Sequence, residues 1–174
     1  MVMTVTQVLG LHIQLLRFKE IAMSYSESEL PKINPKTGKA FPVQLDDESL
    51  AKSLDPLSYD VLRKAGTEVA FTGKYYESET IGVYKCKACS AELFRSETKF
   101  HSGCGWPSFY APKSDDAVVL LEDRSLAPRI RTEVRCASCG SHLGHVFEGE
   151  GYAVPTDQRW CINSVALTLE PKNS

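Results

Sequence analysis

Six cysteines are divided between two kinds of sequence setting. Four of them form two C-x-x-C pairs, Cys86/Cys89 and Cys136/Cys139. Each pair places two thiolates within reach of one cation, and four thiolates around one ion form the closed tetrahedral site typical of structural zinc. Because a closed site leaves no position for a substrate, we expect this metal to stabilise the fold rather than to take part in chemistry.

The paired cysteines also allow other interpretations. One C-x-x-C pair alone could be a thioredoxin-like redox pair, and the four thiols could form two local disulfides or stay buried and free. Iron can also occupy a four-thiolate site. We favour zinc because the two pairs have the same spacing and the chain has no convincing secretory signal, which indicates a reducing compartment.

The two remaining cysteines, Cys104 and Cys161, lie in polar sequence that could support thiol chemistry. If residues 159–169 are extended, Arg159 and Asn163 flank Cys161 on one face. A nearby guanidinium favours the nucleophilic thiolate, and the Asn163 amide could donate a hydrogen bond to a developing charge. Alternatively, Cys161 is a small core residue, since free cysteine is among the most buried residue types.

Glycines on both sides of Cys104 suit a mobile, accessible loop, as needed by a thiol that must meet another sulfur. Two histidines, His142 and His145, follow the second cysteine pair and could exchange protons near neutral pH. Trp106 and Phe147 could line an apolar substrate pocket. The alternatives are an incidental loop cysteine, ordinary hydrogen-bonded histidines and core aromatic residues.

The elements that must position these residues are mainly strands. Residues 129–136 alternate with period two, which predicts one buried and one solvated face, and residues 117–121 could pair with them as a hairpin. Residues 159–169 form another long alternating segment. Short strands separated by glycine and proline predict a mainly β domain of antiparallel strands.

Short N-terminal helices are expected to precede the strands, and one amphipathic helix is predicted at about residues 56–65. Asp55 is a suitable N-cap and Pro56 suits the first helical position. Apolar residues then follow at helical spacing, and Gly66 can end the helix.

The 174 residues suggest one domain, residues 51–174, preceded by a loosely ordered N-terminal extension, residues 1–50. The formal net charge of −2 argues against nucleic-acid binding, and no run approaches the ~18 apolar residues of a membrane span. Residues 1–23 are interpreted as a frayed extension, with an organelle transit peptide as the alternative and Met23 as a possible second start. We therefore expect a cytoplasmic, monomeric protein.

Together these motifs resemble the B-type peptide methionine sulfoxide reductases, in the order and spacing of that family. The match spans residues 55 to 170 and rests on Gly66–Glu68 with Phe71–Tyr75, both cysteine pairs, Ser102–Phe109, His142–Phe147 and Arg159-x-Cys161-x-Asn163. The resemblance implies reduction of the R epimer of methionine sulfoxide, mainly in proteins and more weakly as the free amino acid. It also implies two antiparallel sheets, with one zinc ion far from the active site.

The resemblance further implies a role for each site residue. Cys161 is similar to the nucleophile that attacks the sulfoxide sulfur and becomes a sulfenic acid. His145 is similar to the proton donor to the oxygen, and the orienting groups are His142, Asn163 and Arg159. Trp106 resembles the wall that holds the substrate methyl group. Cys104 resembles the resolving cysteine, which forms a disulfide with Cys161 that thioredoxin then reduces.

The chain departs from the family pattern at two places. His101 stands where many members have an acid, and Glu148 and Gly149 stand where some place an aspartate. The second departure puts in doubt a carboxylate that would support the histidine.

Two functions from other classes compete with the reductase. A zinc-ribbon-like binding module would use the four paired cysteines but leave Cys104 and Cys161 without a role. A general thiol oxidoreductase acting on protein disulfides would require reactivity in one C-x-x-C pair.

Overall fold

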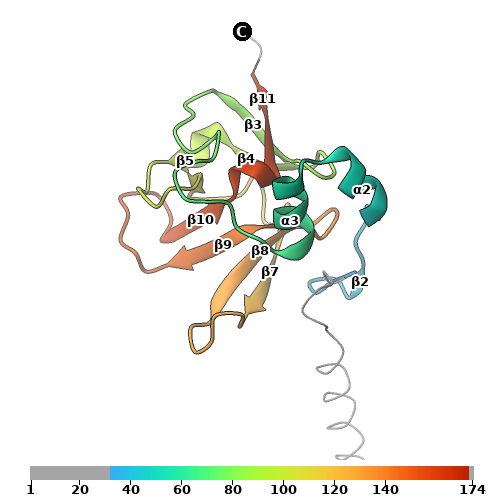
Figure 1. The fold of residues 1–174 in the computed structure, drawn as a ribbon. Coiled ribbons are helices and arrows are strands. Elements are labelled where there is room, and N and C mark those ends of the chain that lie inside the picture. Colours follow the sequence, from blue (N-terminus) through green and yellow to red (C-terminus); the bar gives the residue numbers. More distant parts are fainter. Residues whose placement is uncertain (1–31, 173–174) are drawn as a thin grey trace, which may run out of the picture.

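The fold of the computed structural model, which describes residues 32–172, is built on two antiparallel sheets (Figure 1). The larger sheet has six strands in the order β5 (Lys99–Phe100), β6 (Ser108–Phe109), β10 (Gln158–Ile162), β9 (His142–Glu148), β8 (Arg131–Cys136) and β7 (Val118–Asp123). The smaller sheet has three, in the order β11 (Leu167–Pro171), β3 (Gly82–Cys86) and β4 (Glu92–Arg95). A two-stranded ribbon, β1 (Ile33–Asn34) and β2 (Lys39–Ala40), precedes them. The predicted mainly β fold with two antiparallel sheets is confirmed.

The predicted hairpin is present, but half of the face predicted to be solvated is buried. Strands β7 and β8 pair from Val118 opposite Cys136 to Asp123 opposite Arg131. Val134 and Cys136 are buried as expected, yet the alternating residues Glu133 and Arg135 are buried too. The period-two pattern could not show that this polar face is covered, because the residues covering it come from other strands.

The segment 159–169 is not one strand. Strand β10 ends at Ile162, a 3-10 helix, η2 (Ser164–Ala166), follows, and β11 then joins the other sheet. The break occurs where the Asn163 N–H donates to the Leu143 carbonyl and the Ser164 and Val165 N–H groups donate to the Glu68 carboxylate. The prediction of a single alternating face from residue 159 to residue 167 was therefore wrong beyond Ile162.

Helix α3 (Pro56–Lys64) forms where it was predicted. The Asp55 side chain accepts from the Ser58 N–H and caps the helix. The last helical residue is Lys64, one residue earlier than expected. Ala65, rather than Gly66, takes the left-handed conformation that ends the helix, with φ of 55°.

A second helix, α2 (Asp47–Ser53), lies in a stretch for which the sequence showed little periodicity, and Asp46 caps it. The prediction for residues 1–23, and most of the predicted loose arm, fall outside the described residues. Within the described chain, no helix combines the length and the apolar character that a membrane span requires.

The hydrophobic core lies between the two larger sheets and beneath α3. Phe94 of β4 stacks on Phe109 of β6 with 4.5 Å between ring centroids, so these two rings join the sheets directly. Val61 and Leu62 of α3 are fully buried in the same cluster. The core therefore fixes β6 and β10, the adjacent strands that position the candidate site.

Candidate active site and metal site

The four paired cysteines converge on one point. Their sulfur atoms all lie within 4.8 Å of one another, with Cys86 Sγ to Cys139 Sγ at 3.8 Å and Cys89 Sγ to Cys136 Sγ at 3.6 Å. A tetrahedral ion with bonds of about 2.3 Å would separate its sulfur ligands by about 3.8 Å. The donor set therefore fits one ion, and the four cysteines are positioned to bind a metal.

Both cysteine pairs are held by the same local turn. In each, the first cysteine ends a strand and its carbonyl accepts from the N–H of the residue after the second cysteine, Ser90 or Gly140. Ser90 and Gly140 both have positive φ, at 63° and 73°. A Cβ at Gly140 would lie 2.6 Å from the Phe41 ring, so glycine is also required there for packing.

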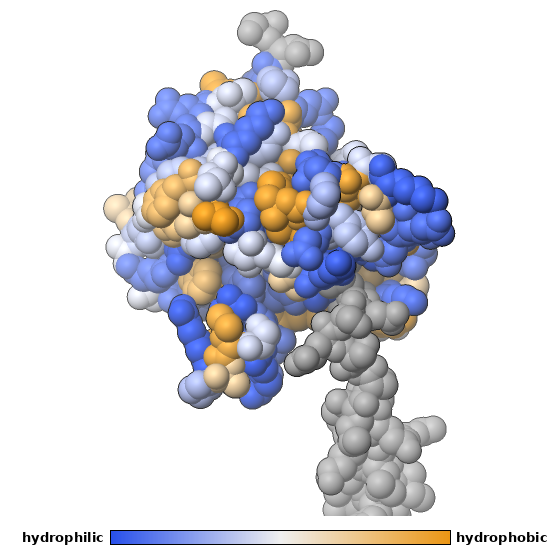
Figure 2. Space-filling model, in the orientation of Figure 1, coloured by the Kyte–Doolittle hydropathy of each residue, from blue (hydrophilic) through white to orange (hydrophobic). Residues whose placement is uncertain are grey.

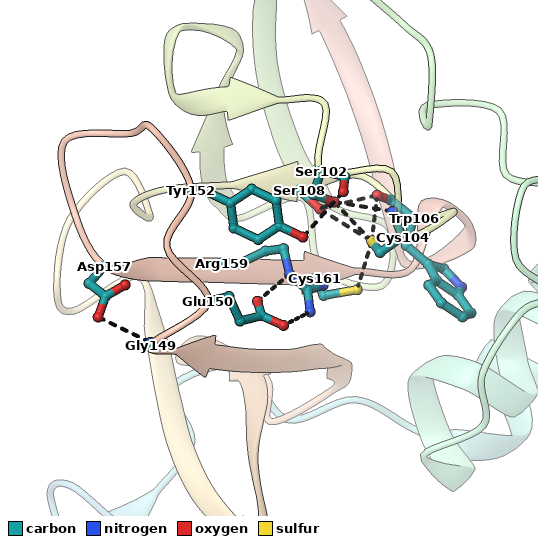
Figure 3. A network of polar contacts seen from close by, with 10 residues as sticks. All are labelled: Ser102, Cys104, Trp106, Ser108, Gly149, Glu150, Tyr152, Asp157, Arg159 and Cys161. Atoms are coloured by element: carbon teal, nitrogen blue, oxygen red, sulfur yellow. Dashed lines mark hydrogen bonds and ion pairs between the residues drawn. The ribbon is translucent and has the colours of Figure 1, made fainter.

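The two unpaired cysteines meet at a separate place. Cys161 lies within β10, Cys104 lies on the loop between β5 and β6, and their sulfur atoms are 3.7 Å apart (Figure 3). Both are free thiols and both are partly buried. Strand β6 pairs with β10 with Ser108 opposite Cys161, which brings the Cys104 loop beside the second sulfur. The family resemblance implied this meeting, whereas no local sequence pattern could show it, because 57 residues separate the two cysteines.

The glycines around Cys104 serve conformation as well as access. Gly103 and Gly105 have φ of 77° and 95°, which side chains rarely adopt. A Cβ at Gly103 would enter open space, whereas one at Gly105 would lie 2.7 Å from the Ala70 Cβ and 2.9 Å from the Phe71 nitrogen. The Cys104 loop is thus packed against residues 70–71 on one side and open on the other.

Hydroxyl groups surround the Cys104 sulfur. The Ser102 hydroxyl donates to it at 3.1 Å and the Ser108 hydroxyl lies at 3.5 Å (Figure 3). The Cys161 thiol and these two hydroxyls lower the pKa of Cys104 to about 4. The hydrogen bond between the two cysteines and burial both raise the pKa of Cys161. The Arg159 guanidinium acts in the opposite direction and lowers that pKa. The pKa values of the two thiols are therefore linked, and that of Cys104 is the lower.

Arg159, two residues before Cys161, is clamped in place. Its Nε and Nη2 donate to the two Glu150 carboxylate oxygens at 2.6 and 2.8 Å, and its guanidinium lies 4.5 Å from the centroid of the Phe147 ring. Phe147, predicted to contact substrate, thus has a ring face against Arg159. Glu150 was not predicted, since an acid in a glycine-containing loop carries no distinctive signal.

His145 lies opposite Cys161 in the pairing of β9 with β10. Its Nε2 is 2.8 Å from Asp123 Oδ2 on β7, and Asp123 also accepts from Arg131 at 2.6 Å. The pKa of His145 is lowered overall, because burial outweighs the opposing effect of Asp123. Asp123 thus occupies the supporting position that the sequence left in doubt, although it comes from another strand.

His142 is almost completely buried beside His145, with 5.6 Å between the ring centroids. Its Nδ1 contacts the Glu133 carboxylate, which also pairs with Arg135 at 2.9 Å. Its Nε2 is buried without a hydrogen-bond partner among the described residues. Glu133, on the buried polar face of β8, thus holds His142 in place.

Asn163 and Trp106 both bind the backbone at Glu68. The Asn163 Oδ1 accepts from the Glu68 N–H at 3.0 Å, and its Nδ2 donates to the Leu143 carbonyl at 3.0 Å. The Trp106 Nε1 donates to the Glu68 carbonyl at 3.1 Å. Glu68, whose pKa burial raises, therefore joins the Trp106 loop to the end of β10.

Comparison with known proteins gives a consistent result. Residues 54–171 match the family model described as the SelR domain. The chain is 53% identical over 133 residues to "Peptide methionine sulfoxide reductase MsrB" of Leifsonia xyli, covering 76% of this chain and 94% of that protein. It is 49% identical over 134 residues to the protein of the same name from Burkholderia vietnamiensis, covering 77% and 92%.

Proposed function

The chain belongs to the peptide methionine sulfoxide reductase MsrB family, and on that basis we propose that it reduces methionine-R-sulfoxide with Cys161 and Cys104. Oxidised proteins are the main substrate, and the free amino acid is a weaker one. The observation that carries the proposal is the 3.7 Å separation between two free sulfurs on separate segments. A disulfide needs about 2.05 Å between sulfurs, so a small movement of the Cys104 loop would close the bond.

The first step transfers oxygen from substrate to enzyme. The Cys161 thiolate attacks the sulfoxide sulfur, and His145 supplies a proton to the oxygen, which is a poor leaving group until protonated. Methionine leaves and Cys161 becomes a sulfenic acid, so one thiol and one sulfoxide give one thioether and one sulfenic acid. The Asp123 carboxylate, 2.8 Å from His145, favours the protonated imidazole that this step needs.

The Cys161 thiolate can form by a proton shift within the sulfur pair. The two sulfur atoms are 3.7 Å apart and either can donate to the other, so a proton that passes from the Cys161 thiol to a Cys104 thiolate leaves the charge on Cys161. Arg159 favours the charge there, because it lowers the pKa of Cys161. Glu150 and Phe147 hold the Arg159 guanidinium in the position from which it acts.

The second step protects the oxidised enzyme. The Cys104 thiol attacks the Cys161 sulfenic acid, which releases water and forms the disulfide. Thioredoxin then supplies two thiols, becomes oxidised itself and returns both enzyme cysteines to the reduced state. Trapping the sulfenic acid in this way prevents irreversible oxidation to the sulfinic acid.

We propose that the ion held by the four paired cysteines is zinc. Four thiolates saturate a tetrahedral ion, so its contribution when bound is to stabilise the fold. Cys86 and Cys136 end strands of different sheets, so the bound ion would tie the two sheets together. We further propose a monomer that acts in a reducing compartment such as the cytoplasm, because free thiols persist there.

A reduction assay with separate R and S epimers, first with dithiothreitol and then with thioredoxin, tests the function. We expect turnover of the R epimer alone, and Cys161→Ser should abolish it with both reductants. Cys104→Ser should keep turnover with dithiothreitol and lose it with thioredoxin. Activity on neither epimer would favour the binding module, and reduction of protein disulfides by a C-x-x-C pair would favour the general oxidoreductase.

A further inference from the structure

Two apolar side chains are displayed on the surface beside the Cys104 loop. Val69 and Phe71 are 72% and 63% exposed, the highest values for large hydrophobic residues in the described part of the chain. They lie in the segment between α3 and β3, which crosses the near side of the molecule in Figure 1, and Figure 2 shows small hydrophobic patches on that side. We call Val69 and Phe71 the apolar ridge.

The conformation of Phe71 is unusual for its type. Three non-glycine residues in the described part of the chain have positive φ: Ala65, Phe71 and Ser90. Ala65 ends helix α3 and Ser90 closes a cysteine turn, whereas Phe71, with φ of 66°, is the third residue of a turn that the Thr72 N–H closes onto the Val69 carbonyl at 3.4 Å, a position usually taken by glycine or asparagine. A bulky residue in this region is strained, and such strain persists where the surroundings impose it, often at functional sites.

The surroundings of the apolar ridge impose its position. The Phe71 N–H donates to the Gly105 carbonyl at 2.8 Å, and an ideal Cβ on Gly105 would lie 3.1 Å from the Phe71 ring. On one side of the ridge the buried Glu68 is fixed by Asn163, Ser164 and Trp106. On the other, the Tyr75 N–H donates to the Ser164 hydroxyl at 2.9 Å. Hydrogen bonds on both sides therefore fix the backbone that carries the two exposed side chains.

The anchors of the apolar ridge are also neighbours of the reacting sulfurs. Gly105 follows Cys104, and Asn163 and Ser164 follow the strand that carries Cys161. A polypeptide whose sulfoxide reached Cys161 would extend over this region at about 3.3 Å per residue. Methionine is common in hydrophobic cores, and its oxidation disrupts them, so the residues next to an oxidised methionine are often apolar.

We propose that the apolar ridge binds an apolar residue of the polypeptide that carries the oxidised methionine. This inference rests on the proposed function and makes Val69 and Phe71 specificity-determining residues. The Phe71 ring and the Val69 methyl groups are already held in place, so binding orders few protein groups. Discrimination arises because an apolar neighbour loses its contact with water on the ridge, whereas a polar neighbour gains little.

Kinetics with three R-sulfoxide substrates test the proposal. They are a pentapeptide with leucine on both sides of the sulfoxide, the same peptide with serine, and N-acetylmethionine sulfoxide. We expect Phe71→Asn, which tolerates positive φ, to lower kcat/KM for the leucine peptide about five- to tenfold through KM. The other two substrates should stay within about twofold, as is usual for surface changes. Phe71→Tyr should keep the selectivity.

Leu120→Thr is the matched control. Leu120 is 47% exposed, and it lines a cavity with Trp160, whose side chain lies on the opposite face of β10 from Cys161. This change should leave all three substrates unaffected. An equal loss on all substrates with Phe71→Asn, or no loss on the leucine peptide, would overturn the proposal.

A binding measurement separates this inference from the proposed function. Fluorescence polarisation would follow a fluorescein-labelled leucine peptide on Cys161→Ser, with and without Phe71→Asn. Weaker binding of the double variant supports the apolar ridge even if the parent protein reduces no sulfoxide, and that inactivity would count against the proposed function alone. Equal binding by both variants would refute the ridge.

Discussion

Two carboxylates, those of Asp123 and Glu150, bind the basic side chains at the site. Asp123 binds both Arg131 and His145, and Glu150 holds Arg159 with two hydrogen bonds. Burial would raise the pKa of Asp123, but its hydrogen bonds from Ser125, His145 and Arg131 hold that pKa below its usual range. Asp123 therefore stays ionised and supports the positive form of His145.

Asp123→Asn should shift the pH dependence of sulfoxide reduction. The amide keeps a hydrogen-bond acceptor but loses the charge that raises the pKa of His145, so that pKa falls further. A proton donor is lost as pH rises through its pKa, and the loss should therefore begin at lower pH in the variant. We expect about a tenfold lower rate near pH 7, measured by single-turnover pH profiles. Glu122→Gln, on the exposed neighbour, should leave the profile unchanged; an unshifted profile for Asp123→Asn would contradict this role.

The thiols of Cys104 and Cys161 should differ in reactivity. Because the pKa of Cys104 is lowered to about 4, iodoacetamide at pH 6 should alkylate Cys104 before Cys161. In Cys104→Ser the anion and hydrogen bond that raise the pKa of Cys161 are gone, so Cys161 should become reactive at lower pH than in the parent. Peptide mass mapping across pH 4–9 measures both. Preferential labelling of Cys161 in the parent would show that the charge rests there.

Sequence reasoning at this scale proposed the reacting side chains and missed some of the residues that the structure places against them. Cys161, Arg159 and His145 belong to compact motifs, which short-range spacing can reveal. Asp123 is 22 residues from His145 and meets it only because β7, β8 and β9 are adjacent. Such a partner depends on strand order, which no local pattern contains.

The helix that leads into the site region begins at a charged cap. Asp55 caps α3 and also accepts from Lys87, which lies between the first pair of cysteines. Lys87 and Ser58 hold the pKa of Asp55 below its usual range. The cap therefore joins helix α3 to the turn of the proposed zinc site.

Asp55→Ala should lower the free energy of unfolding by about 1 kcal/mol at pH 7, the usual value of an N-cap. A carboxyl whose pKa is depressed by folding stabilises the protein above its unfolded pKa and stops doing so as pH falls through its folded pKa. The difference between variant and parent should thus shrink below pH 4. Urea unfolding at pH 7 and pH 3 measures it, with Lys64→Ala as the control. An equal difference at both pH values would contradict the assignment to the carboxylate.

The cysteine turns at the ends of β3 and β8 should bind one ion together. Cys136→Ser should release the metal and remove a stabilisation on the order of 10 kcal/mol, so that the fold is largely lost. Elemental analysis and circular dichroism measure the two effects. Cys104→Ser, outside the cluster, should keep one ion per chain. A metal-free Cys136→Ser protein that stays as stable as the parent would rule out a structural role.

Elements were predictable where one local signal dominated. The Asp-Pro start of α3 and the alternation of β8 both led to the observed element. The break after Ile162 was not predictable, because apolar alternation continues through it while Glu68, 96 residues away, captures the Ser164 N–H. Long-range hydrogen bonding thus overrode the local pattern.

For the molecule as a whole, the two kinds of sulfur site have separate supports. The proposed zinc site joins strands of the two larger sheets, whereas Cys104 and Cys161 meet within the six-stranded sheet through β6 and β10. The mainly β class followed from strand patterns, and the cluster of four cysteines followed from their C-x-x-C spacing. The distance between Cys104 and Cys161 required the fold, since β6 is only two residues long and carries no periodic signal.

The most direct test is a single turnover without reductant. The reduced protein would receive one equivalent of peptide methionine-R-sulfoxide under argon, followed by quenching, digestion without reduction and mass spectrometry. We predict one equivalent of methionine, a disulfide between the Cys104 and Cys161 peptides, and all four paired cysteines unmodified. Methionine formed together with a disulfide inside either C-x-x-C pair, or formed without any change at Cys161, would contradict the account.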